Sequence, residues 1–308
     1  MSQSQIIHVL TGCTAVGKTE TALRWAEAND AEIVNCDSLL FYRGMNVGTA
    51  KPSAEELERV PHHLIDLMPV DQQMDVGRYV ELAIEAVRDI SSRGKQVLVT
   101  GGSGFYLKAF FGPVVDEVQV SDEIRTEVAQ LEAESGVVGI AMRLEDLSPD
   151  CVGQVDLNNP RRVARALERC LASGLTVTEL KKRFAEQRNL LIDSEKCLAV
   201  LERDKGELAE RISQRIGLML EAGLVAEVSG LLEAGIESNS SAATAIGYRE
   251  TIAHLKGDLS LEQLSESIAT NTRRLAKKQR TWFRGQLPKG KVHFLEGNLE
   301  VDVGELFG

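Results

Sequence analysis

The sequence feature that most constrains the fold is an octapeptide near the N-terminus, Gly12-Cys13-Thr14-Ala15-Val16-Gly17-Lys18-Thr19. It has the pattern GxxxxGK[ST] of a phosphate-binding loop, in which backbone amides and a helix N-terminus cradle phosphate groups. An apolar run at residues 6–10 precedes the loop, and a helical apolar pattern follows it as far as Asn29-Asp30. We therefore predict a polyphosphate site in which Lys18 reaches the phosphate chain and the Thr19 hydroxyl holds Mg²⁺.

The segments after the loop alternate between strand and helix patterns. Apolar runs at 31–36 and 96–100 read as buried strands, and residues 75–94 between them carry apolar residues at helical spacing. This alternation is typical of a parallel sheet with helices packed on it. The predicted fold class is therefore α/β, a P-loop type parallel sheet flanked by helices.

The middle of the chain has a different character. Residues 121–184 show helical patterns only, with Ser121 and Asn159-Pro160 as start signals for two of the helices. The strand pattern returns at 197–201 and again at 292–295, with a long helix expected over about 260–284. We predict a P-loop core domain formed by 1–116 and 192–308, with a helical insertion at 117–191. The tract at 238–241 is expected to be an exposed loop.

Charge and cysteine content limit the classes of function. The formal net charge of −11 argues, taken alone, against nucleic acid as a partner. The five cysteines form no CxxC pair, so neither a disulfide framework nor a zinc ribbon is indicated. A reduced cytosol fits best, and the sequence has neither a signal-peptide pattern nor an apolar run of membrane-spanning length. We expect a cytoplasmic protein.

Two polar side chains follow the predicted strands at the edge of the sheet that carries the phosphate loop. Asp37 comes directly after one strand and Ser103 lies in the glycine turn after another. Asp37 is a candidate general base, and its position suits a helix-capping or turn aspartate equally well. A further alternative in a P-loop fold is that this carboxylate holds Mg²⁺. Ser103 is a candidate for contact with phosphate or reacting atoms, and the alternative is an ordinary turn serine. No apolar run ends in the aspartate of a Walker B motif, which weakens the interpretation as an ordinary ATPase.

Arginine and lysine cluster at three places in the sequence. Arg211 and Arg215 are four residues apart, so they share a helix face that suits a diphosphate group if it is not simply solvated. Two further predicted helices carry basic faces, formed by Arg161, Arg162, Arg165 and Arg169 in one and by Arg273, Lys277, Arg280 and Arg284 in the other. Two such faces on an acidic chain indicate a confined site for an RNA backbone.

Taken together, these segments resemble the bacterial tRNA dimethylallyltransferases, also called tRNA isopentenyltransferases, over nearly the whole chain. The order of the motifs is more specific than the phosphate loop alone. The segments that carry the resemblance are GCTAVGKT at 12–19, CDSLLFYRGMNVGTAKP at 36–52, HHLID at 62–66, GGSGFYLKA at 101–109, NPRRVARALE at 159–168, AIGYRE at 245–250 and TRRLAKKQRTWFR at 272–284.

The resemblance implies an activity and a set of site residues. That family transfers a dimethylallyl group from dimethylallyl diphosphate to the exocyclic amine of the adenosine 3′ of the tRNA anticodon. It implies that the loop from Gly12 to Thr19 holds the diphosphate, that Asp37 is the general base, and that Arg215 contacts the diphosphate. Ser103 stands where the family commonly has threonine. Positions expected to contact the anticodon stem-loop of tRNA are Asp37, Ser38, Leu39, Leu40, Ser103, Arg125, Arg161, Arg162, Arg165, Thr244, Gly247, Arg249, Lys277 and Arg280.

Three departures from the family pattern accompany the resemblance. Leu40 replaces a common glutamine, Asn46 replaces a usual aspartate, and Ser103 keeps the hydroxyl of the threonine it replaces. Mg²⁺ is the expected cofactor, and a monomer that binds no membrane is the expected form. The alternatives that the residues leave open are a P-loop small-molecule kinase, a prenyltransferase acting on free AMP or ADP, and a nucleotide-dependent RNA-binding protein without chemistry.

Overall fold

The computed structural model describes residues 6–297 and 301–308 of the chain. These residues divide into two compact units, the first reaching to Phe111 and resuming at Leu190, the second comprising Gly112–Asn189. The chain thus leaves the first unit once and returns to it, as an insertion does. The sequence pattern predicted this insertion at 117–191.

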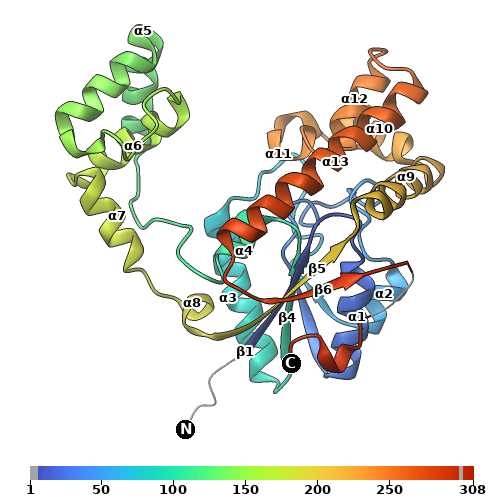
Figure 1. Cartoon of the computed structure of the whole chain (residues 1–308). Coiled ribbons are helices and arrows are strands. Elements are labelled where there is room, and N and C mark those ends of the chain that lie inside the picture. The colour runs from blue at the N-terminus through green and yellow to red at the C-terminus, as the bar shows by residue number, and fades with distance from the viewer. Residues whose placement is uncertain (1–5, 298–300) are drawn as a thin grey trace. The chain divides into compact units, whose positions relative to one another are not determined.

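A six-stranded sheet forms the centre of the first unit (Figure 1). Its order is β3-β2-β4-β1-β5-β6, and every neighbouring pair is parallel. All five residues of β2 are buried, as expected for a parallel strand covered on both faces, although Glu32 and Asn35 among them are polar. The predicted α/β class is confirmed. The strands are β1 (Ile6–Gly12), β2 (Ala31–Asn35), β3 (His62–His63), β4 (Gln96–Gly101), β5 (Glu195–Arg203) and β6 (Lys291–Leu295).

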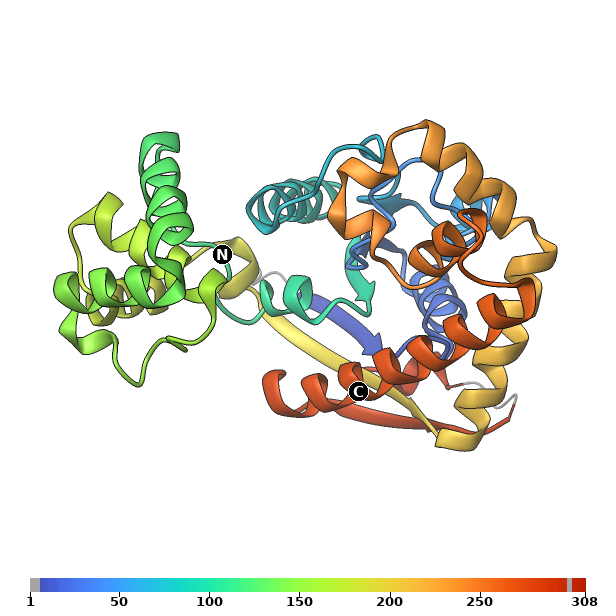
Figure 2. The same ribbon diagram turned by 90° about the horizontal axis from the view of Figure 1, so that it is seen from above.

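Helices cover the sheet and extend beyond its carboxyl edge. α1 packs on β1, β2 and β4, while α3 packs on β2 and β4. α13 contacts α4, α9, α12 and the end of β1, so it lies beside the phosphate loop (Figure 2). The helices of this unit are α1 (Lys18–Ala28), α2 (Ala54–Arg59), α3 (Val76–Ser92), α4 (Gly104–Lys108), α8 (Leu190–Asp193), α9 (Lys205–Glu221), α10 (Leu224–Glu233), α11 (Ser240–Ala243), α12 (Tyr248–Leu255) and α13 (Leu261–Gln286).

The tract at 238–241 is exposed at its three serines, as predicted, but it is not a loop: it joins the 3₁₀ helix η2 (Ile236–Ser238) to α11, and Asn239 between them is buried. Asn239 is fully buried, and its Nδ2 donates to the carbonyls of Val70 (2.9 Å) and Gln72 (2.7 Å). Its Oδ1 accepts the amides of Ser241 and Ala242 and so caps α11. An asparagine that is buried because its side-chain NH₂ group bonds to distant backbone carbonyls is a tertiary feature, which composition does not reveal.

The second unit is helical, as predicted, and has its own apolar core. Its helices are α5 (Asp122–Leu147), α6 (Pro160–Ser173) and α7 (Val177–Ala185), with the short 3₁₀ helix η1 at Pro149–Cys151. The predicted start of α6 is observed, because the Asn159 side chain accepts the Arg162 amide and Pro160 occupies the first turn. Apolar side chains of α5, α6 and α7 form the core, among them Ile140, Leu144, Val163, Leu167 and Leu180.

All five cysteines are free. Among the residues that the structure describes, no helix combines the length and the apolar character that crossing a bilayer needs.

Candidate active site

The phosphate loop joins β1 to α1 in a conformation that its glycines permit. Gly12 and Gly17 have φ angles of 154° and 111°, which side chains rarely adopt. A Cβ atom on Gly12 would lie 2.6 Å from the Leu201 carbonyl oxygen of the neighbouring strand. Glycine at position 12 therefore allows the loop to pass against β5 before it turns into the helix.

Two arginines hold the loop from outside. Arg203 Nε donates to the Val16 carbonyl (2.9 Å), and Arg211 Nε donates to the Ala15 carbonyl (3.0 Å). These two bonds tie the phosphate loop to β5, which ends at Arg203, and to α9, which carries Arg211. Of the two arginines that share this face of α9 (Lys205–Glu221), Arg215 lines both cavities around Lys18 and Asp37, whereas Arg211 is bonded to the phosphate loop.

Lys18 lies in the centre of the site. Its Nζ donates to the carbonyls of Gly12 (2.9 Å) and Cys13 (3.0 Å), which orients the side chain along the loop. Burial lowers the pKa of Lys18 to about 8, against smaller opposing contributions from Cys13 and Asp37. The ammonium group is thus poorly hydrated, and an anion placed beside it would interact with it strongly.

Asp37 follows β2 and is half-buried. Its amide donates to Asn35 Oδ1 (2.8 Å), and its own Oδ1 accepts the Leu39 amide (3.0 Å). Asn35 is in turn held by its Nδ2, which donates to the Leu64 carbonyl (2.9 Å). The turn that a capping aspartate would make is therefore present, and it also orients the carboxylate toward the neighbouring cavity, which Asp37 lines.

The turn after β4 packs directly on the backbone that leads to Asp37. A Cβ atom on Gly101 would lie 2.1 Å from the Cys36 carbonyl oxygen, so only glycine fits there. The Ser103 amide donates to that same oxygen (3.3 Å). Gly102 lines a cavity with Lys18 and Asp37, whereas Ser103 is not among the described residues that line the two central cavities. Ser103 stands at the N-cap of α4 without capping it through its side chain.

Arg215 reaches the same place from α9. Its Nη2 donates to the Thr49 carbonyl (3.1 Å), and burial lowers its pKa from the ordinary value while the charge of Asp37 opposes that shift. Thr49 belongs to a loop that Glu227 of α10 holds, since its carboxylate accepts the amides of Asn46 (2.9 Å), Val47 (2.6 Å) and Gly48 (3.1 Å). Glu227 was not predicted from the sequence, because a helical glutamate gives no local signal of distant amide partners.

Two cavities meet around these side chains. Each has a volume of about 130 Å³, and both are lined by Thr14, Lys18, Asp37, Thr49 and Arg215, which we call the polar centre. One cavity continues between apolar side chains of α1, β2 and the following loops, including Ala22, Ile33, Leu40, Pro52 and Ile65. The other continues between apolar side chains of α9, α13 and the segment before α12, including Ile212, Ile216, Met219, Ile246, Ile268 and Leu275. A charged centre between two apolar arms suits a reaction between two partly apolar molecules at a phosphate group.

Thr19 lies in the first turn of α1 and lines one cavity with Lys18 and Asp37. The described residues contain no group of three or more histidine, cysteine, aspartate or glutamate side chains arranged to hold a metal ion. The Thr19 hydroxyl as a protein ligand fits Mg²⁺, which is commonly held by one or two protein oxygens together with substrate phosphates and water.

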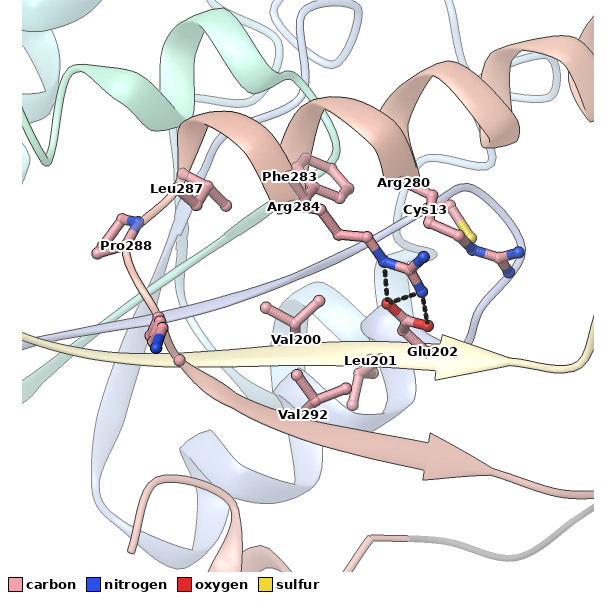
Figure 3. Close-up of a pocket in the computed structure, with 12 residues that line it drawn as sticks. Cys13, Val200, Leu201, Glu202, Arg280, Phe283, Arg284, Leu287, Pro288 and Val292 are labelled. Atoms are coloured by element: carbon pink, nitrogen blue, oxygen red, sulfur yellow. Dashed lines mark hydrogen bonds and ion pairs between the residues drawn. The ribbon is translucent and has the colours of Figure 1, made fainter.

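A separate cavity lies near the phosphate loop, and Cys13 is among its lining residues. It has a volume of about 300 Å³ and lies between the C-terminal half of α13 and strands β5 and β6 (Figure 3). Arg284 Nη2 donates to both carboxylate oxygens of Glu202 (2.8 and 3.0 Å), and Arg284 Nε donates to Glu202 Oε1 (3.3 Å). Arg280 Nη2 donates to the Arg203 carbonyl (3.1 Å). These contacts fasten α13 to the sheet, so Arg280 and Arg284 are less free than the basic face predicted from sequence.

The remaining residues expected to contact RNA lie in both units. In the first unit, Thr244, Arg249 and Lys277 are exposed, while Gly247 is buried and lines a central cavity. In the second unit, Arg125, Arg161, Arg162 and Arg165 are exposed. Arg161, Arg162 and Arg165 line a groove of about 450 Å³ with Arg169 and Lys181. Arg169 itself forms an ion pair with Asp116.

Ser38, Leu39 and Leu40 follow Asp37 on the loop after β2. All three are half-buried, and Leu40 forms part of one apolar arm. The substitution of a common glutamine by Leu40 therefore makes that arm more apolar.

The parallel sheet, the phosphate loop and the polar centre define a P-loop type protein that acts on a phosphorylated substrate. The family model described as IPP transferase matches residues 40–286. The chain belongs to this family.

Relatives and solved structures agree with that assignment. The tRNA dimethylallyltransferase of Opitutus terrae is 58% identical over 98% of this chain and 96% of its own length. That of Geobacter sulfurreducens is 39% identical over 90% of this chain and 88% of its own length. A full-length tRNA isopentenylpyrophosphate transferase from Bacillus halodurans has a TM-score of 0.65 at 32% identity, covering 95% of this chain and 90% of that one. A eukaryotic dimethylallyltransferase acting on tRNA has a TM-score of 0.81 at 27% identity, covering 95% and 74%.

Proposed function

We propose that this protein transfers a dimethylallyl group from dimethylallyl diphosphate to the exocyclic amine of the adenosine 3′-adjacent to the anticodon of tRNA, releasing diphosphate. The observation that carries the proposal is the polar centre, where Lys18, Asp37 and Arg215 face both apolar-armed cavities in a member of the IPP transferase family. Lys18 and Arg215 are the cations that would stabilise the leaving group, and Asp37 is the carboxylate that would accept the proton.

The donor side of the reaction requires stabilisation of a departing diphosphate. When the allylic carbon–oxygen bond breaks, its electron pair stays on the diphosphate oxygen. The loop amides, the buried Lys18 ammonium and the Arg215 guanidinium stabilise that charge as it develops, and they do so strongly because water is largely excluded. The Thr19 hydroxyl would hold Mg²⁺ on the diphosphate, and the ion would supply further Lewis-acid stabilisation of the leaving group.

The acceptor side requires a base. The adenine amine is a weak nucleophile, so it must be held against the allylic carbon and lose a proton as the new nitrogen–carbon bond forms. Asp37 takes that proton on its carboxylate, which the Leu39 amide orients. Ser103 follows Gly102 in the adjoining turn, and we assign its hydroxyl to contact with the substrates at the edge of the site.

The apolar arms serve the two organic groups. A dimethylallyl chain and an adenine ring both gain from contact with apolar side chains, and both arms converge on Asp37. An adenosine in a stem-loop is stacked, so it must flip out to reach this depth, at a cost of a few kcal/mol. Phosphate contacts by the exposed arginines and lysines hold the anticodon stem-loop during that step.

We further propose that the protein acts as a cytoplasmic monomer. The five free cysteines agree with a reducing compartment. All groups of the polar centre come from one chain, so the site is complete without a second copy.

The test is transfer of labelled dimethylallyl from its diphosphate to unmodified tRNA that carries adenosine 3′ of the anticodon. We expect label in the tRNA, at that nucleoside, with release of diphosphate. A second arm offers ATP with small-molecule acceptors, and a third offers AMP or ADP in place of tRNA. ATP consumption without prenyl transfer would establish the kinase alternative, and efficient transfer to free nucleotide would establish the other.

A further inference from the structure

The phosphate loop and the turn after β4 are joined by a single side chain from α13. Gln279 Oε1 accepts the amide of Thr14 (3.0 Å), and Gln279 Nε2 donates to the carbonyl of Gly102 (2.9 Å). The three residues are separated by long stretches of sequence, and all of them line the same cavity. The carboxamide therefore spans the gap between the donor loop and the turn.

The fit of this carboxamide is tight. A Cβ atom on Gly102 would lie 2.8 Å from Gln279 Nε2 and 3.8 Å from Lys18 Nζ. Glycine at 102 thus leaves the space that the carboxamide fills, next to the lysine expected to bind the diphosphate. Both hydrogen-bonding ends of Gln279 are used, one as acceptor and one as donor, so the amide orientation is determined by its partners.

The turn transmits this position to Asp37. Gly101 packs against the Cys36 carbonyl, whose oxygen also accepts the Ser103 amide (3.3 Å), and Asp37 is the next residue after Cys36. A connection of three contacts therefore runs from the Thr14 amide through Gln279 and the 101–103 turn to the backbone that carries the base.

The helix that carries Gln279 is bonded to the sheet and packed against α4. On α13, Arg284 pairs with Glu202 and Arg280 donates to the Arg203 carbonyl, as Figure 3 shows for the former pair. A Cβ atom on Gly104 would lie 2.6 Å from the Trp282 indole, so the helix also contacts α4 closely. Because α13 is fastened at these points, its glutamine can fix the separation of two loops.

We propose that Gln279 is a positioning residue that sets the separation between the phosphate loop and the Asp37 carboxylate, and so aligns the allylic carbon with the adenine amine. This inference rests on the proposed function. Gln279 touches neither leaving group nor proton in this role, and it acts through Thr14 and Gly102. Reacting atoms misplaced by about 1 Å cost roughly 10²-fold in rate, so the effect falls on kcat.

The first experiment replaces Gln279 by methionine, which has similar length and neither hydrogen-bonding group. We expect Q279M to lower kcat about 10²-fold, with the KM for tRNA and the thermal unfolding midpoint close to wild type. Q286M is the matched control, because Gln286 is exposed at the end of the same helix. Equal kcat values for Q279M and Q286M would overturn the inference, as would a kcat loss accounted for by a lower folded fraction.

The second experiment uses Q279E. The ionised carboxylate still accepts the Thr14 amide but repels the Gly102 carbonyl oxygen, whereas the protonated acid donates to it as glutamine does. We expect the ratio of Q279E to wild-type kcat to rise as pH falls toward about 5. A flat ratio would contradict the positioning role. Absence of prenyl transfer by the wild-type and Q286M proteins would instead refute the proposed function, so the two failures are distinguishable.

Discussion

Burial distinguishes the charged side chains of the polar centre. Lys18 loses hydration inside the loop, and its pKa falls to about 8, while the guanidinium of Arg215 stays charged although burial lowers its pKa as well. Asp37 is half-buried and held by a backbone amide. The lysine is therefore the group whose charge changes near neutral pH, and the carboxylate is the group placed to take a proton.

Replacement of Asp37 by asparagine tests the base. The substituted carboxamide retains an oxygen for the Leu39 amide and cannot take a proton, so we expect kcat to fall by about 10²- to 10⁴-fold, the usual contribution of general-base catalysis. Binding of tRNA should change little. Single-turnover transfer and tRNA affinity measure the two effects, with D258N on an exposed loop as the control. A D37N enzyme with the wild-type rate would exclude this mechanism.

The Lys18 pKa predicts the pH dependence of donor binding. The free lysine is charged below about pH 8 and neutral above it, so the Kd for dimethylallyl diphosphate should rise roughly tenfold per pH unit above that value. Arginine stays protonated throughout this range, so the Kd of K18R should not rise above about pH 8, whatever its absolute affinity. Calorimetric titrations across that range measure both proteins. If the Kd of K18R rises with pH as that of the wild type does, the titration belongs to another group.

At the scale of elements, loops carry the site and helices hold the loops. Arg203 and Arg211 hold the phosphate loop, while Glu227 of α10 holds the 46–48 loop through three amides and also accepts the Tyr248 hydroxyl (2.7 Å). Asn46 donates its amide to this carboxylate. The aspartate usual at position 46 would add a second negative charge beside Glu227, which Asn46 avoids.

Replacement of Glu227 by glutamine tests this loop support. The amide NH₂ group would face backbone donors, and the charge-assisted bonds would be lost, so we expect unfolding free energy to fall by about 2 kcal/mol. Displacement of Thr49 should also weaken its contact with Arg215 and raise the KM for the donor. Urea unfolding and donor kinetics provide the measurements, with E233Q on the exposed side of α10 as control. If E227Q is as stable as E233Q, the bonds from Glu227 to the 46–48 loop contribute nothing to the free energy of unfolding.

A separate prediction concerns tRNA binding by the exposed arginines of α6. The ion pairs of these arginines are long. Arg162 Nη1 lies 3.9 Å from Asp156 Oδ2, and Arg165 Nη1 lies 4.0 Å from Glu168 Oε2. If they contact tRNA phosphates, R162A/R165A should weaken tRNA binding and reduce the salt-dependence slope by about 2, with donor binding unchanged. R88A on α3 is the control. A salt slope equal to that of R88A would identify the α6 arginines as a solvated face.

At the scale of the whole molecule, an acidic protein carries local basic surfaces on two compact units. The net charge of −11 is compatible with an RNA partner because binding depends on where cations cluster. The second unit has its own apolar core and its own basic groove.

Loss of the protein from cells provides a test at this scale. If tRNA is the substrate, the dimethylallyl-modified adenosine next to the anticodon should be missing from total tRNA of a deletion strain. Mass spectrometry of digested tRNA measures it. Restoration by the wild-type gene and not by a D37N gene would tie the modification to this site, and an unaltered nucleoside content would refute the assignment to tRNA.

Local patterns were sufficient for much of the fold and for part of the site. The phosphate loop, the strands β1, β2, β4, β5 and β6, the long helix α13 and the helical nature of the second unit follow from apolar period and capping residues, which are short-range properties. The two-residue strand β3 at His62–His63 was not predicted, because so short a strand carries no apolar period. Asp37 and the glycine turn were expected at one edge, because parallel strands place their carboxyl ends together.

Other features depend on residues distant in the sequence. Gln279 bonds to Thr14, Glu227 to the 46–48 loop, Arg211 to Ala15, and Asn239 to the backbone near Val70. None of these contacts has a local signal, because a polar side chain on a helix looks the same whether it faces water or a loop far away in the chain. The sequence by itself thus determined the fold class and the phosphate loop. Only the tertiary structure decided which side chains hold the phosphate loop and Asp37 in position, since the packing of distant elements sets the distances between them.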